Sequence, residues 1–220
     1  SGRLSYELYK EEIETLLRTP GLAGYQLLGL TDFPGQGTAT IGMLDAFWRD
    51  KGFAGAEDFR QFCAPSVPLL GLKQRVFLSS ERVVGSAMVR HEGSARTAEL
   101  CWRVLDHAGH QLHEGVLPPR TLTPGSLVEY GDIEFGLEAW DSPKRLKIEL
   151  RVDDHSNSWA IWSLPQNLEP VNIEDVLVAE FYREDVRRAL SAGRKVWLRL
   201  NPKRAHYGVP GRFATAFWSP

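Results

Sequence analysis

RLKIELRV, residues 145–152, alternates charged and apolar side chains along its whole length. Successive side chains of a β-strand point to opposite faces, so Leu146, Ile148 and Leu150 would share one face. The arginines, the lysine and the glutamate between them would share the other. The pattern therefore predicts a strand of an antiparallel sheet, with one face against a core and one face in water.

Short segments of similar character lie on both sides of this strand, between residues 73 and 164. Residues typical of turns separate them, at 106–109, 118–119, 123–125, 141–143 and 153–157. We expect strands at 74–78, 82–90, 98–106, 111–117, 126–135, 145–152 and 158–164. Short strands at this spacing predict an antiparallel β-sandwich of immunoglobulin or jelly-roll type over residues 72–165.

The N-terminal residues have helical periodicity instead. Residues 5–18 predict a helix with Ser5 as N-cap, apolar residues on one face and charged residues, Glu14 among them, on the opposite face. A second, short helix is expected at 57–63, and a proline-containing linker at 64–71.

Between these helices the sequence reads GYQLLGLTDFPGQGTATIGMLDAFWRDK, residues 24–51. It predicts a strand at 24–30, a polar loop at 31–38 and a helix at 41–50, in the order of a βα unit. One such unit is far short of a complete (β/α)₈ barrel, which needs about 250 residues. The stretch is therefore expected to be part of something larger.

The C-terminal residues again alternate strands and a helix. We expect a strand at 176–179, a helix at 183–191 and a strand at 195–200, which together form a parallel βαβ unit. Residues 171–220 are therefore predicted to be a partial α/β domain. The whole chain is predicted to be of the α+β class.

Composition excludes several kinds of partner. A net charge of −2 and a pI near 6.3 favour neither nucleic acid nor a membrane surface, and no apolar run is long enough to span a membrane. Cys63 and Cys101 lack the spacing of a zinc site, and His107, His110 and His113 lie around an expected turn. No metal and no cofactor is expected.

Several segments resemble family 2 glycoside hydrolases of the β-galactosidase-like, multidomain bacterial type. The segments are SYELYKEEIE (5–14), RTPGLAGYQLL (18–28), DFPGQGT (32–38) and LDAF (44–47). NSWAIWSLP (157–165) is similar to the last strand of the sandwich that follows the family's barrel, and 176–220 is similar to the start of a further α/β domain.

The resemblance implies that residues 1–64 are the end of a catalytic barrel. The family's two catalytic glutamates would then precede Ser1, so no catalytic residue is expected here. The family commonly has Asp-Leu-Gln-Asp-Phe where this chain has Gly29-Leu30-Thr31-Asp32-Phe33. Members of the family are often periplasmic or secreted, but the sequence assigns this chain no compartment.

Five residues are candidates for contact with a sugar. Asp32 follows the expected barrel strand and could accept a hydrogen bond from a sugar hydroxyl, or could only stabilise its own turn. Gln36 and Thr38 lie in the same loop. Trp159 and Trp162 could stack on sugar rings, but their spacing places them on opposite faces of a strand, one in the core and one exposed.

Three functions remain open from the sequence. The first is an accessory region of a glycoside hydrolase that is structural or contacts glycan and is not catalytic by itself. The second is a free-standing glycoside hydrolase that uses pairs such as Asp153 with Asp154, or Glu129 with Asp132. The third is a protein-interaction module that forms homo-oligomers through the exposed edge of the expected strand at 25–30.

Overall fold

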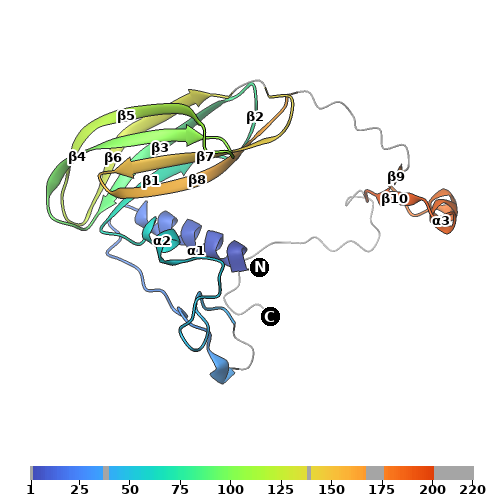
Figure 1. Cartoon of the computed structure of the whole chain (residues 1–220), viewed down its shortest axis with the longest axis horizontal. Coiled ribbons are helices and arrows are strands. Elements are labelled where there is room, and N and C mark those ends of the chain that lie inside the picture. Colours follow the sequence, from blue (N-terminus) through green and yellow to red (C-terminus); the bar gives the residue numbers. More distant parts are fainter. Residues whose placement is uncertain (1, 37–39, 138–139, 167–175, 201–220) are drawn as a thin grey trace. The chain divides into compact units, whose positions relative to one another are not determined.

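The computed structural model describes residues 2–36, 40–137, 140–166 and 176–200 (Figure 1). The chain divides into two compact units, Ser1–Asn167 and Leu168–Pro220. Among the described residues, the larger unit contains two sheets, two α-helices and a 3₁₀ turn, and the smaller unit contains two strands and one α-helix.

The larger unit is a β-sandwich of mainly antiparallel strands, which confirms the predicted α+β class (Figure 1). One sheet has the order β1-β3-β6, comprising β1 (Ser66–Leu72), β3 (Arg82–His91) and β6 (Ser126–Gly136). The other has the order β2-β8-β7-β4-β5. Its strands are β2 (Val76–Leu78), β4 (Arg96–Leu105), β5 (Gln111–Leu122), β7 (Lys144–Val152) and β8 (His155–Leu164). All of its neighbouring strands are antiparallel except β2, which is parallel to β8.

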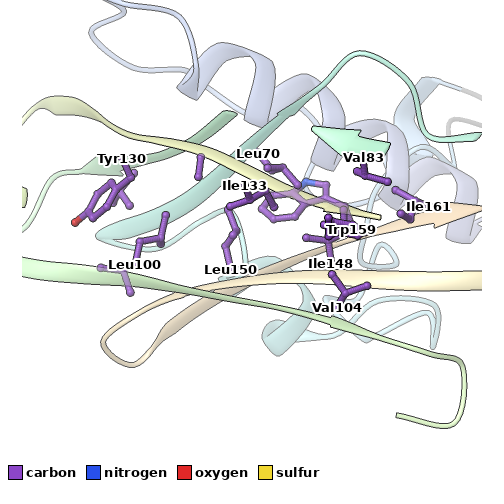
Figure 2. Close-up of a cluster of buried hydrophobic side chains, with 14 of the residues drawn as sticks. Leu70, Val83, Leu100, Val104, Tyr130, Ile133, Ile148, Leu150, Trp159 and Ile161 are labelled. Carbon is purple, nitrogen blue, oxygen red and sulfur yellow. The ribbon is translucent and has the colours of Figure 1, made fainter. Parts of the chain in front are cut away.

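The core lies between the two sheets, where their inward side chains meet (Figure 2). The alternation in residues 145–152 is confirmed, because Leu146, Ile148, Leu150 and Val152 are all buried. Complete burial of such a side chain contributes about 1.5–3 kcal/mol relative to leaving it exposed. The seven strands expected from the sequence all form, with small shifts at their ends.

The predicted linker at 64–71 is wrong, because most of it forms β1. Pro68 lacks a backbone N–H, but β1 is at the edge of its sheet, where a strand can accommodate a proline. Side chains on both faces of β1 are buried. Leu70 joins the sandwich core, whereas Val67 and Leu69 join a second cluster on the outer side.

The turn expected at Pro118 and Pro119 is also wrong, because β5 continues through both residues. β5 is the edge strand of the larger sheet. Its register with β4 shifts at this point, so that the two prolines lie between the pairs Ala98–Arg120 and Leu100–Leu117. A bulge at an edge strand is one of the few places where a sheet accepts proline.

Helix α1 (Gly2–Leu17) packs against the outer side of β1 together with α2 (Ala56–Arg60). Both helices were predicted, but α1 begins before Ser5, so Ser5 is not its N-cap. Two side chains from other parts of the chain also donate hydrogen bonds to backbone carbonyls of β1. Arg18 Nη1 donates to Leu70 O at 3.4 Å, and Asn157 Nδ2 donates to Pro68 O at 2.9 Å.

The βα unit expected at 24–50 is wrong, because this segment contains neither the strand nor the helix. Its described residues form a 3₁₀ turn (Pro34–Gln36) and isolated bridges of Leu44 with Thr31 and Asp50. A strand is stable only when it is paired and covered, and here Leu28 and Phe47 are 75% and 76% exposed. The assignment of residues 1–64 to the end of a barrel stays a prediction.

The smaller unit contains the predicted βαβ arrangement. β9 (Val176–Ala179) and β10 (Lys195–Leu198) are parallel, and α3 (Glu184–Ser191) connects them. Val186 and Ala189 are the buried residues of α3. Gly193, with a φ of 75°, follows the helix in the left-handed conformation that commonly ends helices. No described helix combines the length and the apolar character needed to cross a membrane.

Candidate functional site

A cleft of about 420 Å³ lies between α1 and the outer face of strands β7 and β8. Helix α1 contributes one wall and the two strands contribute the other. The lining residues discussed below are Arg3, Glu7, Lys10, Glu11, Arg75, Arg145, Lys147, Trp159 and Trp162. The cleft therefore combines aromatic side chains with charged side chains of both signs.

Two of the predicted sugar-contact residues meet in this cleft. Trp159 is 3% exposed and Trp162 is 41% exposed. The expectation that one tryptophan lies in the core and the other on the surface is confirmed. Trp162 thus keeps an accessible indole ring at the cleft, while Trp159 is part of the sandwich core and lines the cleft from there.

Below the cleft, a buried polar network fixes α1 to the sandwich. Glu14 is fully buried, and its carboxylate accepts hydrogen bonds from Trp159 Nε1 at 2.7 Å and from Asn157 Nδ2 at 2.8 Å. Lys10 Nζ lies 2.7 Å from Glu14 Oε1 and also donates to Asn157 Oδ1. The indole N–H of Trp159 is therefore engaged by the protein itself.

The sequence interpretation did not identify this network, and it placed Glu14 on the solvent side of the helix. That placement is wrong, because Glu14 faces β8. Only two features of the sequence pointed to this network. Lys10 and Glu14 have the spacing of a helical ion pair, and Asn157 is a polar residue at an inward position of a strand.

The carboxylates at the opening of the cleft are held by arginines. Glu11 accepts hydrogen bonds from Arg75 Nη2 at 2.6 Å and from Arg18 Nη2 at 3.1 Å. Burial raises the pKa of Glu11, but the two guanidinium groups outweigh this effect and lower the pKa below its usual value. Glu7 forms an ion pair with Arg3 at 3.2 Å.

This arrangement suits binding better than acid catalysis. A catalytic carboxylic acid needs a raised pKa so that it still carries its proton at neutral pH. The pKa of Glu11 is shifted in the opposite direction. Its carboxylate is instead an ionised group that positions Arg75 beside the cleft.

Asp32 lies in the irregular segment, not in this cleft. Its Oδ1 accepts hydrogen bonds from Gly42 N at 2.9 Å and Lys51 Nζ at 2.6 Å. Both contacts hold the segment together, as expected if Asp32 stabilises its own turn. Gln36 ends the 3₁₀ turn, and Thr38 lies outside the described residues. Sugar contact by these three residues stays a prediction.

Possible metal ligands form no site in the part of the chain that the structure describes. There, no three His, Cys, Asp or Glu side chains are grouped so that they could hold an ion. His110 Nδ1 instead lies 3.0 Å from Asp106 Oδ2 within its own turn.

Comparison with protein families gives one match. Residues 85–165 match a family model described as a domain of unknown function (DUF8488). The match begins within β3 and ends one residue after β8, so it includes Trp159 and Trp162 but not α1. No curated protein matches the chain significantly.

Solved structures similar to this chain include carbohydrate-active enzymes. The exo-chitosanase CsxA of Amycolatopsis orientalis matches 77% of this chain at 12% identity and a TM-score of 0.49. A cycloisomaltooligosaccharide glucanotransferase of Paenibacillus sp. matches 56% at 17% identity and a TM-score of 0.38. The DNA glycosylase AlkC of Pseudomonas fluorescens, bound to DNA containing an abasic site analog, matches 50% at 14% identity and a TM-score of 0.36.

The chain spans only part of each of these proteins. It covers 19% of the exo-chitosanase chain, 17% of the glucanotransferase chain and 33% of the glycosylase chain. Glycoside hydrolases are thus among the similar structures, at low identity. Similarity at this level does not transfer an activity.

Proposed function

We propose that this chain is a carbohydrate-contacting, non-catalytic part of a family 2-type glycoside hydrolase. The observation that carries the proposal is the cleft in which the open indole of Trp162 lies beside charged side chains. An indole ring offers a flat apolar face to the C–H groups of a sugar, while the polar side chains around it can bond to hydroxyls.

Two further points support a binding role over hydrolysis. The pKa of Glu11 is lowered, not raised, and Glu7 is paired with Arg3. In the resemblance to family 2 enzymes, the first fifty residues correspond to the end of the barrel, and none of them corresponds to either catalytic glutamate of the family. A retaining glycosidase needs two such carboxyl groups about 5–5.5 Å apart.

Calorimetric titration with a panel of oligosaccharides tests the proposal. We expect at least one to bind, and Trp162→Ala to weaken that binding by about tenfold or more, since tenfold corresponds to about 1.4 kcal/mol. Trp197→Ala is the matched control, because Trp197 is also an exposed tryptophan on a strand, in the other unit. Equal binding by Trp162→Ala and the unchanged protein would contradict the proposal. Release of reducing sugar by the chain alone would contradict its non-catalytic part.

Self-association is a second candidate function, and a specific observation favours it. The segment 24–50 exposes Leu28, Ile41, Phe47 and Trp48, all by more than half of their surface. Exposed apolar side chains of this size contribute to protein–protein contact where they form a contiguous patch. The edge of a strand at 25–30, on which the sequence prediction relied, does not form. Contact would therefore involve these side chains.

A further inference from the structure

We infer that the cleft between α1 and β7–β8 recognises an anionic sugar, whose carboxylate or sulfate group binds Arg145 and Lys147 while its ring stacks on Trp162. The inference rests on the proposed carbohydrate contact and specifies the chemistry of the ligand.

The strand register places these three side chains together. Arg145 is directly opposite Trp162 in the antiparallel pair of β7 and β8, and Lys147 is opposite Ala160. Residues two apart on a strand share a face and lie about 7 Å from each other. Arg145 and Lys147 are both exposed and both line the cleft. Two cationic groups therefore flank the open indole ring within reach of one ligand.

The charges of the cleft do not balance. Five cationic side chains line it, Arg3, Lys10, Arg75, Arg145 and Lys147, against the two carboxylates Glu7 and Glu11. Arg3 is paired with Glu7, Arg75 with Glu11, and Lys10 with the buried Glu14. The positive excess consequently falls on Arg145 and Lys147.

These two groups are the least neutralised. Among the described residues, no carboxylate lies within ion-pair distance of Arg145. Lys147 Nζ lies 3.5 Å from Glu149 Oε2, but Glu149 also binds Arg103 Nη2 at 2.5 Å. A chain with a net charge of −2 thus presents, at an aromatic cleft, one arginine without an ion pair to any described residue and one lysine whose carboxylate partner is shared with Arg103.

An acidic sugar fits this combination of groups. A guanidinium presents parallel N–H donors that match a carboxylate or a sulfate, and the ammonium group of a lysine adds charge without a fixed direction. The indole contributes an apolar face for the ring. Single-stranded nucleic acid also combines anionic and flat groups. We favour the sugar because the chain as a whole is acidic and a cleft of about 420 Å³ is of small-ligand size.

Titration of the full chain with paired probes tests this inference. The probes are trigalacturonate, its methyl ester, a sulfated carrageenan tetrasaccharide and a single-stranded oligothymidylate. We expect trigalacturonate or the sulfated probe to bind about tenfold or more tightly than the uncharged ester, and the advantage to shrink as salt is raised. A preference between the two acidic probes identifies the anionic group and supports the inference in either case.

Variants that remove one charge test whether Arg145 and Lys147 cause the preference for acidic probes. Arg145→Gln and Lys147→Gln should each reduce the acidic preference, whereas Arg151→Gln should not. Arg151 lies on the same outward face of β7 but lines a different cleft. All three positions are exposed, and circular dichroism checks that each variant folds.

The outcomes separate this inference from the proposed function. Equal, Trp162-dependent binding of the acid and its ester would overturn the anionic preference and leave carbohydrate contact intact. Binding that is independent of Trp162, or that is absent both for these probes and for every oligosaccharide of the panel, would overturn both. Tighter Trp162-dependent binding of oligothymidylate than of any sugar would overturn the choice of ligand class.

Discussion

Glu14 has no exposed surface, and its carboxylate binds the side chains of Lys10, Asn157 and Trp159. Removing it would leave the indole N–H of Trp159 without its acceptor and the buried ammonium group of Lys10 without a carboxylate, while the amide of Asn157 would keep only Pro68 O. Breaking a buried ion pair by removal of one partner costs about 3–5 kcal/mol. We expect Glu14→Ala to lower the free energy of unfolding by this amount, as measured by urea denaturation.

The control for this variant lies on the same helix. Glu12 is exposed, so Glu12→Ala should change the free energy of unfolding by less than about 0.5 kcal/mol. A loss below about 1 kcal/mol in Glu14→Ala would contradict the role assigned to the network.

Tyr6 makes stability depend on alkaline pH. Its hydroxyl donates to Asp58 O at 3.1 Å, and burial, followed by the charge of Asp58, raises the pKa of Tyr6 above its ordinary value of 10.0. The unfolded chain therefore loses this proton near pH 10 while the folded chain retains it, so stability should fall as the pH rises above 10.

Tyr6→Phe removes this contribution. The variant should lose about 1 kcal/mol at neutral pH, because one hydrogen bond is lost, and should show a shallower decline above pH 10. Urea denaturation at several pH values measures both effects. Parallel pH profiles for the variant and the unchanged protein would show that Tyr6 does not cause the decline.

At the scale of the elements, close packing around Gly85 limits what β3 can accept. A Cβ atom at this position would lie 2.8 Å from Leu70 Cδ1 and 2.9 Å from Leu72 Cδ2. Overpacking of a filled core costs about 1–3 kcal/mol. We expect Gly85→Ala to lower the thermal midpoint of the sandwich, as measured by calorimetry.

Gly136→Ala is the matched substitution on the neighbouring strand β6. A Cβ atom there would be 3.9 Å from its nearest atom, Arg82 Nη1, which is ordinary contact. The thermal midpoint of the Gly136→Ala variant should equal or slightly exceed that of the unchanged protein. If both variants melt alike, the contact of Gly85 with the leucines does not limit the packing of the sheets.

The elements that could be predicted from the sequence are those with a periodic pattern. Strands such as β7 and helices such as α1 have one buried, apolar face and one exposed, charged face. Their local sequence therefore indicates where they form. The prolines of β1 and β5 misled the interpretation, because edge position and a bulge are properties of the whole sheet.

The prediction of a strand and a helix in segment 24–50 was wrong for a related reason. Its apolar residues favour a strand and a helix only when other elements cover them, and in this structure they are exposed. For the site, the opposed orientation of Trp159 and Trp162 followed from strand geometry. That Arg145 lies beside the two tryptophans, and that Glu14 binds Trp159, could not be predicted, because both depend on contacts between distant parts of the chain.

For the whole molecule, the exposed side chains of this segment predict concentration-dependent association. We expect sedimentation velocity to show larger species as the protein concentration rises, because association would bury apolar surface at about 25 cal/mol per Å². Replacement of Phe47 and Trp48 by serine should shift the distribution toward monomer. Val116→Ser, at an exposed apolar residue of β5, is the control. A single monomeric species at all concentrations would contradict the prediction.

The open edge of β1 is covered by side chains from two other parts of the chain, one just after α1 and one in β8. The carbonyls of Leu70 and Pro68 are bound by Arg18 and Asn157, and are thereby denied to an incoming strand. Growth of amyloid from this edge would first require both the contact of Arg18 and the contact of Asn157 to break.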